Sequence, residues 1–200
     1  LEQRQVGRTQ RPRRTQMIEQ PAKNSGSQPE GCTNPDGQQT LQVMDIVAGT
    51  SVDGPGLRTS IYLAGCAHHC PECHNPQTWA PDAGHPMSVD EIVHEVEKHG
   101  FDVTLTGGDP MYNAAAVIPL ARRLREAGFR IWCYTGYHYE QVCNDPVRAK
   151  LLKYIDVLVD GPYVHARRDI SLLFRGSDNQ RLVDCQRSTP GHIILWSSDF

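Results

Sequence analysis

Apolar and polar residues along the chain follow a pattern that predicts strands and helices in turn. Short apolar or β-branched runs at residues 57–64, 101–106, 130–134 and 154–160 are typical of buried strands. Glycine or proline comes within two residues of the end of each run, so each predicted strand opens into a loop. The loops at these strand ends are therefore the first places to look for a site.

Helical periodicity fills the segments between these runs. Ser88 and Glu91 form a capping box, and the apolar spacing that follows predicts a helix that ends at Gly100. A second helix is predicted over residues 114–127. Pro119 has to lie in or near the first turn of that helix, because a proline further inside would kink it.

The order of these elements predicts the architecture. Asp145 and Pro146 are typical of the start of a third helix, and residues 192–196 are predicted to form a last edge strand. Strands that alternate with helices favour an α/β fold with a parallel sheet and the helices outside. The folded part is shorter than the ~250 residues of a complete eight-stranded barrel. We therefore expect a partial, open β/α barrel.

Composition divides the chain into two parts. Residues 1–40 are rich in Gln, Arg, Pro, Ser and Gly and contain few apolar side chains, which predicts a disordered tail. Residues 41–200 carry the periodic pattern and are predicted to form one core domain.

Charge and hydropathy exclude some classes of partner. With 20 basic and 23 acidic residues, the formal charge is -3, so the chain has no basic field that favours nucleic acid. No apolar run approaches the ~20 residues of a membrane span, and no secretory signal is recognisable. We expect a cytoplasmic protein with neither a nucleic acid nor a membrane as its partner.

Three of the seven cysteines lie in one short motif. Cys66, Cys70 and Cys73 have the spacing C-x3-C-x2-C, directly after the strand predicted at residues 57–64. Because secretion is not indicated, this cluster favours metal binding over disulfides. The remaining cysteines are scattered and are expected to be plain thiols: Cys32, Cys133, Cys143 and Cys185.

Two metal centres fit three neighbouring cysteines. A 4Fe–4S cluster has four irons, so three thiolates leave one iron open to a substrate or cofactor. A closed zinc site needs a fourth protein ligand, which one of the nearby histidines His68, His69 or His74 supplies. The spacing favours the open cluster and leaves zinc as the alternative.

A glycine pair follows the second predicted strand. Gly107 and Gly108 precede Asp109, and without side chains they let backbone approach a ligand closely. Such a segment on its own is a common turn, so its meaning depends on the cysteine motif.

These motifs together resemble a known family. Residues 52–79, VDGPGLRTSIYLAGCAHHCPECHNPQTW, resemble the opening of a radical S-adenosylmethionine (SAM) enzyme. The resemblance is strongest to the activating enzymes of anaerobic ribonucleoside-triphosphate reductase, and it extends over residues 41–188. The later motifs that carry it are LTGGDP, IWCYTGY, DVLVDGPYV and FRGSDNQ.

The resemblance implies a fold, two cofactors and a set of site residues. The fold is the partial, open β/α barrel of the radical SAM type. Cys66, Cys70 and Cys73 hold a 4Fe–4S cluster, and SAM binds to its open iron. The backbone of Glu72, Cys73 and His74 lies beside the adenine, and the methionine end lies at Gly107, Gly108 and Asp109.

The resemblance also implies an activity. The cluster receives one electron from an external donor and cleaves SAM, and the resulting 5′-deoxyadenosyl radical generates a glycyl radical on the large subunit of anaerobic ribonucleotide reductase. Two alternatives within the superfamily are an activase of another glycyl-radical enzyme and a different small radical SAM enzyme. An alternative of another class is a zinc-stabilised binding module without catalysis.

Overall fold

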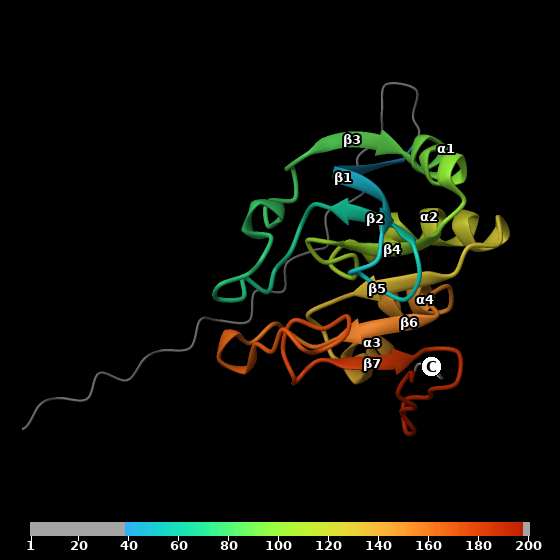
Figure 1. Cartoon of the computed structure of the whole chain (residues 1–200). Helices are drawn as coiled ribbons and strands as arrows, with labels where there is room; N and C mark the ends of the chain where they lie inside the picture. Colours follow the sequence, from blue (N-terminus) through green and yellow to red (C-terminus); the bar gives the residue numbers. More distant parts are fainter. Residues whose placement is uncertain (1–38, 198–200) are drawn as a thin grey trace, which may run out of the picture.

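The computed structural model describes residues 39–197, which form a mixed sheet with helices packed on one face (Figure 1). The strands are β1 (Thr40–Thr50), β2 (Arg58–Leu63), β3 (His85–Ser88), β4 (Asp102–Gly107), β5 (Ile131–Tyr134), β6 (Val157–Asp160) and β7 (Arg181–Asp184). The helices are α1 (Val89–His99), α2 (Ala114–Glu126), α3 (Tyr139–Asn144) and α4 (Arg148–Leu152), with 3-10 turns at Pro76–Thr78 and His165–Arg167. The tail predicted over residues 1–40 lies outside the described residues, apart from Gln39 and Thr40.

The sheet is open, with the strand order β3-β1-β2-β4-β5-β6-β7. The strands β2, β4, β5 and β6 are parallel, as predicted, whereas β1, β3 and β7 pair antiparallel with their neighbours. The antiparallel pairing of β1, β3 and β7 corrects the prediction of a parallel sheet for these strands. For β1 and β2 the physical reason is chain length: the seven residues 51–57 between them are too few for a parallel crossover, which needs about a dozen or more.

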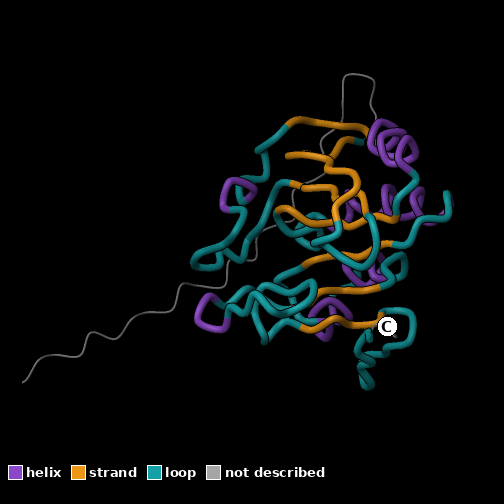
Figure 2. Tube along the Cα trace, in the orientation of Figure 1, coloured by secondary structure: helices purple, strands orange, loops and turns teal. Residues whose placement is uncertain are grey.

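Each face of the sheet carries an apolar cluster, and the two clusters differ in size. The helices cover the face that presents Ile61, Leu105, Cys133 and Leu158, which are all fully buried. The opposite face carries a smaller apolar cluster of Trp132, Val157 and Val159, on which Tyr134, Phe174, Leu182 and Trp196 pack. Loops and the two short 3-10 turns, rather than α-helices, lie where the parallel strands end (Figure 2). The site forms there.

Local sequence rules account for the first two helices. Ser88 Oγ accepts a bond from the Glu91 amide at 3.2 Å, Glu91 accepts one from the Ser88 amide at 2.7 Å, and Gly100 ends α1 with φ 67°. The predicted capping box is thus confirmed. The helix α2 begins at Ala114 as predicted, and the amides of Ala116 and Val117 bond to Asn113 at its start. Pro119 is its sixth residue, next to the first turn, which agrees with the predicted position in or near that turn.

The carboxyl-terminal part departs most from the predictions. Residues 192–196 form only isolated bridges, so the edge strand predicted there is wrong, and β7 takes the edge beside β6 instead. Among the described residues, no helix has both the length and the apolar character needed to cross a bilayer.

Candidate functional site

The cysteine loop begins where β2 ends, at the carboxyl edge of the parallel strands. It leaves the sheet and returns to it, because the Gly65 amide bonds to Thr78 O at 2.8 Å and the Cys66 amide bonds to Trp79 O at 3.1 Å. Trp79 also packs edge-on against His69, with ring centroids 4.7 Å apart. The loop is thus closed at its base.

A cleft at the carboxyl ends of β2, β4, β5 and β6 contains the predicted site. It encloses about 840 Å³, including the space open to solvent. Cys66, Cys70 and Cys73 line it together with His74, Gly107, Gly108 and Asp109. The structure therefore brings together all the predicted site residues except Glu72, which is exposed and does not line the cleft.

The three sulfur atoms lie close to backbone amides. Asn75 N donates to Cys73 Sγ at 3.4 Å. Burial raises the pKa of Cys66 to about 11, and the amides of His68 and His69 oppose that rise. Burial likewise raises the pKa of Cys70, against the opposing effect of the Tyr163 amide. Such donors stabilise a thiolate, which is the form that binds metal, so metal binding here releases protons.

These thiols fit a cluster better than a single ion. Within residues 39–197, no group of three or more His, Cys, Asp or Glu side chains is gathered closely enough to hold one metal ion. A 4Fe–4S cluster attaches each cysteine to a different iron, so its ligands need only face one cleft. Three half-buried thiols with amide donors on one cleft meet that requirement.

The two glycines of the predicted methionine end have a packing role that the sequence did not reveal. A Cβ on Gly107 would come within 2.6 Å of the Leu63 backbone, and one on Gly108 within 2.5 Å of Gly65 O. The Gly108 amide bonds to Leu63 O at 2.7 Å, and the Asp109 amide bonds to Gly65 O at 2.8 Å. The glycines therefore hold β4 tightly against the strand from which the cysteine loop leaves.

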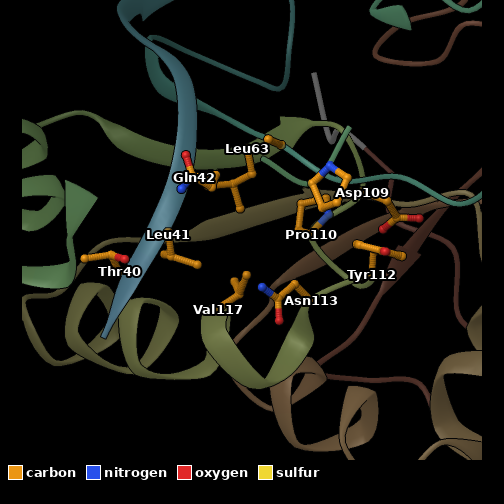
Figure 3. Close-up of a pocket in the computed structure, with 11 residues that line it drawn as sticks. Thr40, Leu41, Gln42, Leu63, Asp109, Pro110, Tyr112, Asn113 and Val117 are labelled. Atoms are coloured by element: carbon orange, nitrogen blue, oxygen red, sulfur yellow. The ribbon is translucent and has the colours of Figure 1, made fainter. Parts of the chain in front are cut away.

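Asp109 separates the cleft from a second, more apolar cavity. That cavity, of about 520 Å³, lies between β1, the end of β2 and the start of α2, and Leu41 and Val117 line it (Figure 3). Figure 3 shows the Asp109 carboxylate turned away from these two side chains. The carboxylate therefore belongs to the cleft that the cysteines line.

Several residues of the cleft were missed by sequence reasoning. Asp53 reaches it from the turn between β1 and β2, where its Oδ2 accepts bonds from Ser60 Oγ at 2.8 Å and Tyr62 OH at 3.1 Å. Burial and the Asp53 carboxylate raise the pKa of Tyr62 to about 12. Sequence reasoning missed Asp53 because it begins the sequence Asp-Gly-Pro-Gly, which is fully explained as a turn and gives no sign of a binding site. Gln180 comes from the segment before β7.

The described cysteines outside the motif do not line the cleft. Cys133 is fully buried among the helices, and burial raises its pKa well above the ordinary value. Burial also raises the pKa of Cys143 and Cys185. The expectation of plain thiols agrees with these surroundings, while Cys32 lies outside the described residues.

Comparison with known proteins agrees with the site. Residues 52–183 match the family model described as a 4Fe-4S single cluster domain. Three relatives, each called anaerobic ribonucleoside-triphosphate reductase-activating protein, align over most of their own length. The one from Escherichia coli K12 is 35% identical over 64% of this chain and 89% of the relative. The one from Vibrio cholerae is 37% identical over 64% and 88%, and that of bacteriophage T4 is 37% identical over 66% and 86%.

Among solved structures, QueE from Escherichia coli superposes with a TM-score of 0.42 and 20% identity, over 48% of this chain and 53% of that one. A superposition of that quality adds nothing to the assignment.

Fold and site together define an iron–sulfur protein whose cluster loop lies at the carboxyl edge of an open α/β sheet. The chain belongs to the family of anaerobic ribonucleoside-triphosphate reductase-activating proteins. The predicted family and the predicted 4Fe–4S cofactor are thereby confirmed.

Proposed function

We propose that this protein is a radical SAM activase that generates a glycyl radical on anaerobic ribonucleoside-triphosphate reductase. The observation that carries the proposal is a cleft lined by three cysteines and, within the described residues, by no fourth one. A cluster held there keeps one iron free for SAM. The names of the relatives point to the reductase as the partner.

The bound cofactors supply the chemistry. A 4Fe–4S cluster held by Cys66, Cys70 and Cys73 would pass one electron from an external donor to SAM. The bond between sulfur and C5′ would then break to give methionine and a 5′-deoxyadenosyl radical, and that radical would take a hydrogen atom from a glycine Cα of the reductase. The protein has to hold both cofactors and keep the radical away from water.

We assign the cofactor contacts to two segments. Cys66, Cys70 and Cys73 bind the cluster, and Gly107, Gly108 and Asp109 border the methionine end. The adenine end lies at Glu72, Cys73 and His74. Because the Glu72 side chain is exposed, its contact comes from main-chain atoms, and its φ of 56° turns the backbone there.

Other residues of the cleft shape and shield it. The Tyr163 ring lies 5.0 Å from the His74 ring, so it covers the loop from the side of β6. The amide of Tyr163 also faces Cys70. The sheet does not close beyond β7, and an open side suits a protein substrate better than a small molecule.

The test is anaerobic activation. The reconstituted protein is reduced and mixed with SAM and with the reductase large subunit of the same organism. We expect stoichiometric 5′-deoxyadenosine and an organic glycyl-radical signal in the electron paramagnetic resonance (EPR) spectrum. SAM cleavage with no radical on this reductase would instead favour another glycyl-radical enzyme or a small substrate. The absence of SAM cleavage would overturn the proposal.

A further inference from the structure

The carboxylate of Asp109 joins segments that are far apart in the sequence. Asp109 is only 2% exposed. Its Oδ1 accepts the Met111 amide at 2.8 Å, and its Oδ2 accepts Thr135 Oγ1 at 3.0 Å and the Gly136 amide at 3.1 Å. The end of β4 is thereby bonded to the loop that follows β5.

The same oxygen contacts the cysteine loop. His68 lies between Cys66 and Cys70, and its Nε2 is 3.0 Å from Asp109 Oδ2. The ring is turned so that this contact does not have the angle of a hydrogen bond. It is a short polar contact, and the His68 side chain is only 20% exposed. His68 is thus placed against the carboxylate that holds the β5 loop.

The neighbours of His68 leave its ring little freedom. A Cβ on Gly136 would lie 2.4 Å from the ring, so only glycine at this position leaves room for it. On another side, the Tyr137 ring packs edge-on at 4.5 Å. Tyr137 is itself held by Arg148, whose guanidinium lies 4.0 Å from the ring centroid and donates to the hydroxyl at 3.1 Å.

We propose that His68 is a positioning residue that fixes the cysteine loop onto the loop after β5, through Asp109 and the space left by Gly136. His68 does not ligate the cluster. It holds Cys66 and Cys70 in the geometry that retains the cluster, and Asp109 contributes to that role in addition to bordering the methionine end. This inference rests on the proposed function only in requiring that a cluster binds.

The contact between His68 and Gly136 allows a double-mutant test, whose expected result differs from that of a general loss of fold stability. His68→Ala removes the ring, and Gly136→Ala pushes on it. If the two residues act through each other, the clash in Gly136→Ala disappears once His68 is alanine. His68→Gln restores a polar group of similar reach. His69→Ala is the matched control, because His69 is in the same loop but packs on Trp79.

The measurement is the rate at which the reconstituted protein loses its visible iron–sulfur absorbance to an iron chelator, without SAM or reductase. We expect about tenfold faster loss in His68→Ala and in Gly136→Ala, since groups behind metal ligands typically change metal affinity about 10- to 100-fold. The double variant should match His68→Ala alone. His68→Gln should recover most of the retention, and His69→Ala should stay near the wild type.

Two results would overturn the inference. One is loss at the wild-type rate in His68→Ala, and the other is an effect of Gly136→Ala that is undiminished when residue 68 is alanine. The melting temperature of each variant without metal shows whether a fold defect causes the loss. If the wild-type protein itself takes up no cluster, the proposed function fails, whereas equal retention in all variants removes only the role of His68.

Discussion

Gly108 lies directly against Gly65, so that a Cβ added to Gly108 would approach the Gly65 carbonyl oxygen to 2.5 Å. The contact is between two backbones, and neither can move without disturbing the pairing of β4 with the end of β2. The glycine segment therefore joins the cysteine loop to the sheet at the same place where it borders the cleft.

Gly108→Ala should consequently destabilise the protein. Forcing a methyl group into a close-packed contact costs about 1–3 kcal/mol. The free energy of unfolding, measured with urea on the metal-free protein, checks this value. Gly191→Ala is the control, because a Cβ at Gly191 meets nothing within 4 Å. Equal unfolding midpoints for the two variants would contradict the packing role.

The ligand assignment predicts two groups of cysteine variants. Changing Cys66, Cys70 or Cys73 to alanine should remove the intact 4Fe–4S cluster and abolish SAM cleavage. The variants Cys133→Ala, Cys143→Ala and Cys185→Ala should keep about four irons per chain, because these cysteines do not line the cleft. The iron and sulfide content of each variant, measured after anaerobic reconstitution, shows which cysteines bind the cluster. Loss of iron in the second group would show that the ligands are misassigned.

Gln180 is predicted to fix the loop after β6. Its Nε2 donates to Gly161 O at 3.1 Å, and its Oε1 accepts the amides of Gly176 at 2.9 Å and Ser177 at 3.2 Å. Gln180→Ala leaves these buried groups unpaired, which costs about 1–3 kcal/mol.

Hydrogen exchange of the metal-free protein checks this prediction. The amides of Gly161, Tyr163 and Val164 should exchange faster in Gln180→Ala, while Gln77→Ala, a change at an exposed position of the cysteine loop, should leave them unchanged. Unaltered exchange in Gln180→Ala would mean that other bonds hold the loop, such as the one from Asn179 Nδ2 to Pro162 O.

A pH-dependent contribution to stability is expected at Arg181. Its guanidinium bonds to Glu140 and lowers the pKa of that carboxyl from 4.5 to about 2. A depressed carboxyl pKa stabilises the fold above pH 4.5, and this contribution is lost as the pH falls towards 2. Arg181 also pairs with Asp160, which is fully buried and would be left without this partner.

Arg181→Gln should therefore reduce the free energy of unfolding by about 3 kcal/mol at pH 7, as expected when a buried pair loses one member. The difference from the wild type should shrink between pH 4.5 and pH 2. Urea titrations across this range provide the measurement. Arg122→Gln serves as the control, since among the described residues Arg122 forms only an exposed ion pair, with Glu126. A difference that stays constant with pH would contradict the assignment to Glu140.

Much of the sheet was predictable because its central strands are apolar runs that end in glycine. Ile61 and Leu105 belong to such runs, and both were placed correctly in strands. The edge strands were missed because their sequences are half polar, as in β7 with Arg181 and Asp184. Their strand conformation comes from pairing with a neighbour rather than from local preference.

The site likewise has a part that the sequence predicts and a part that only the structure shows. The cysteine spacing and the family resemblance located the loop and the glycine segment, because those residues are close in sequence. The contact between His68 and Asp109 joins residues 41 positions apart and depends on the room beside Gly136. The Glu72 side chain is exposed on a left-handed backbone and lies outside the cleft, so only its main-chain atoms are left for the adenine contact that the resemblance implies.

The central claim is that one iron of the cluster has no protein ligand and receives SAM. The most direct measurement is the EPR spectrum of the dithionite-reduced wild-type protein, recorded with and without SAM under anaerobic conditions. The account predicts a 4Fe–4S signal whose g values and line shape change when SAM is added, because the cofactor coordinates the open iron. A 4Fe–4S spectrum that is identical with saturating SAM would contradict it.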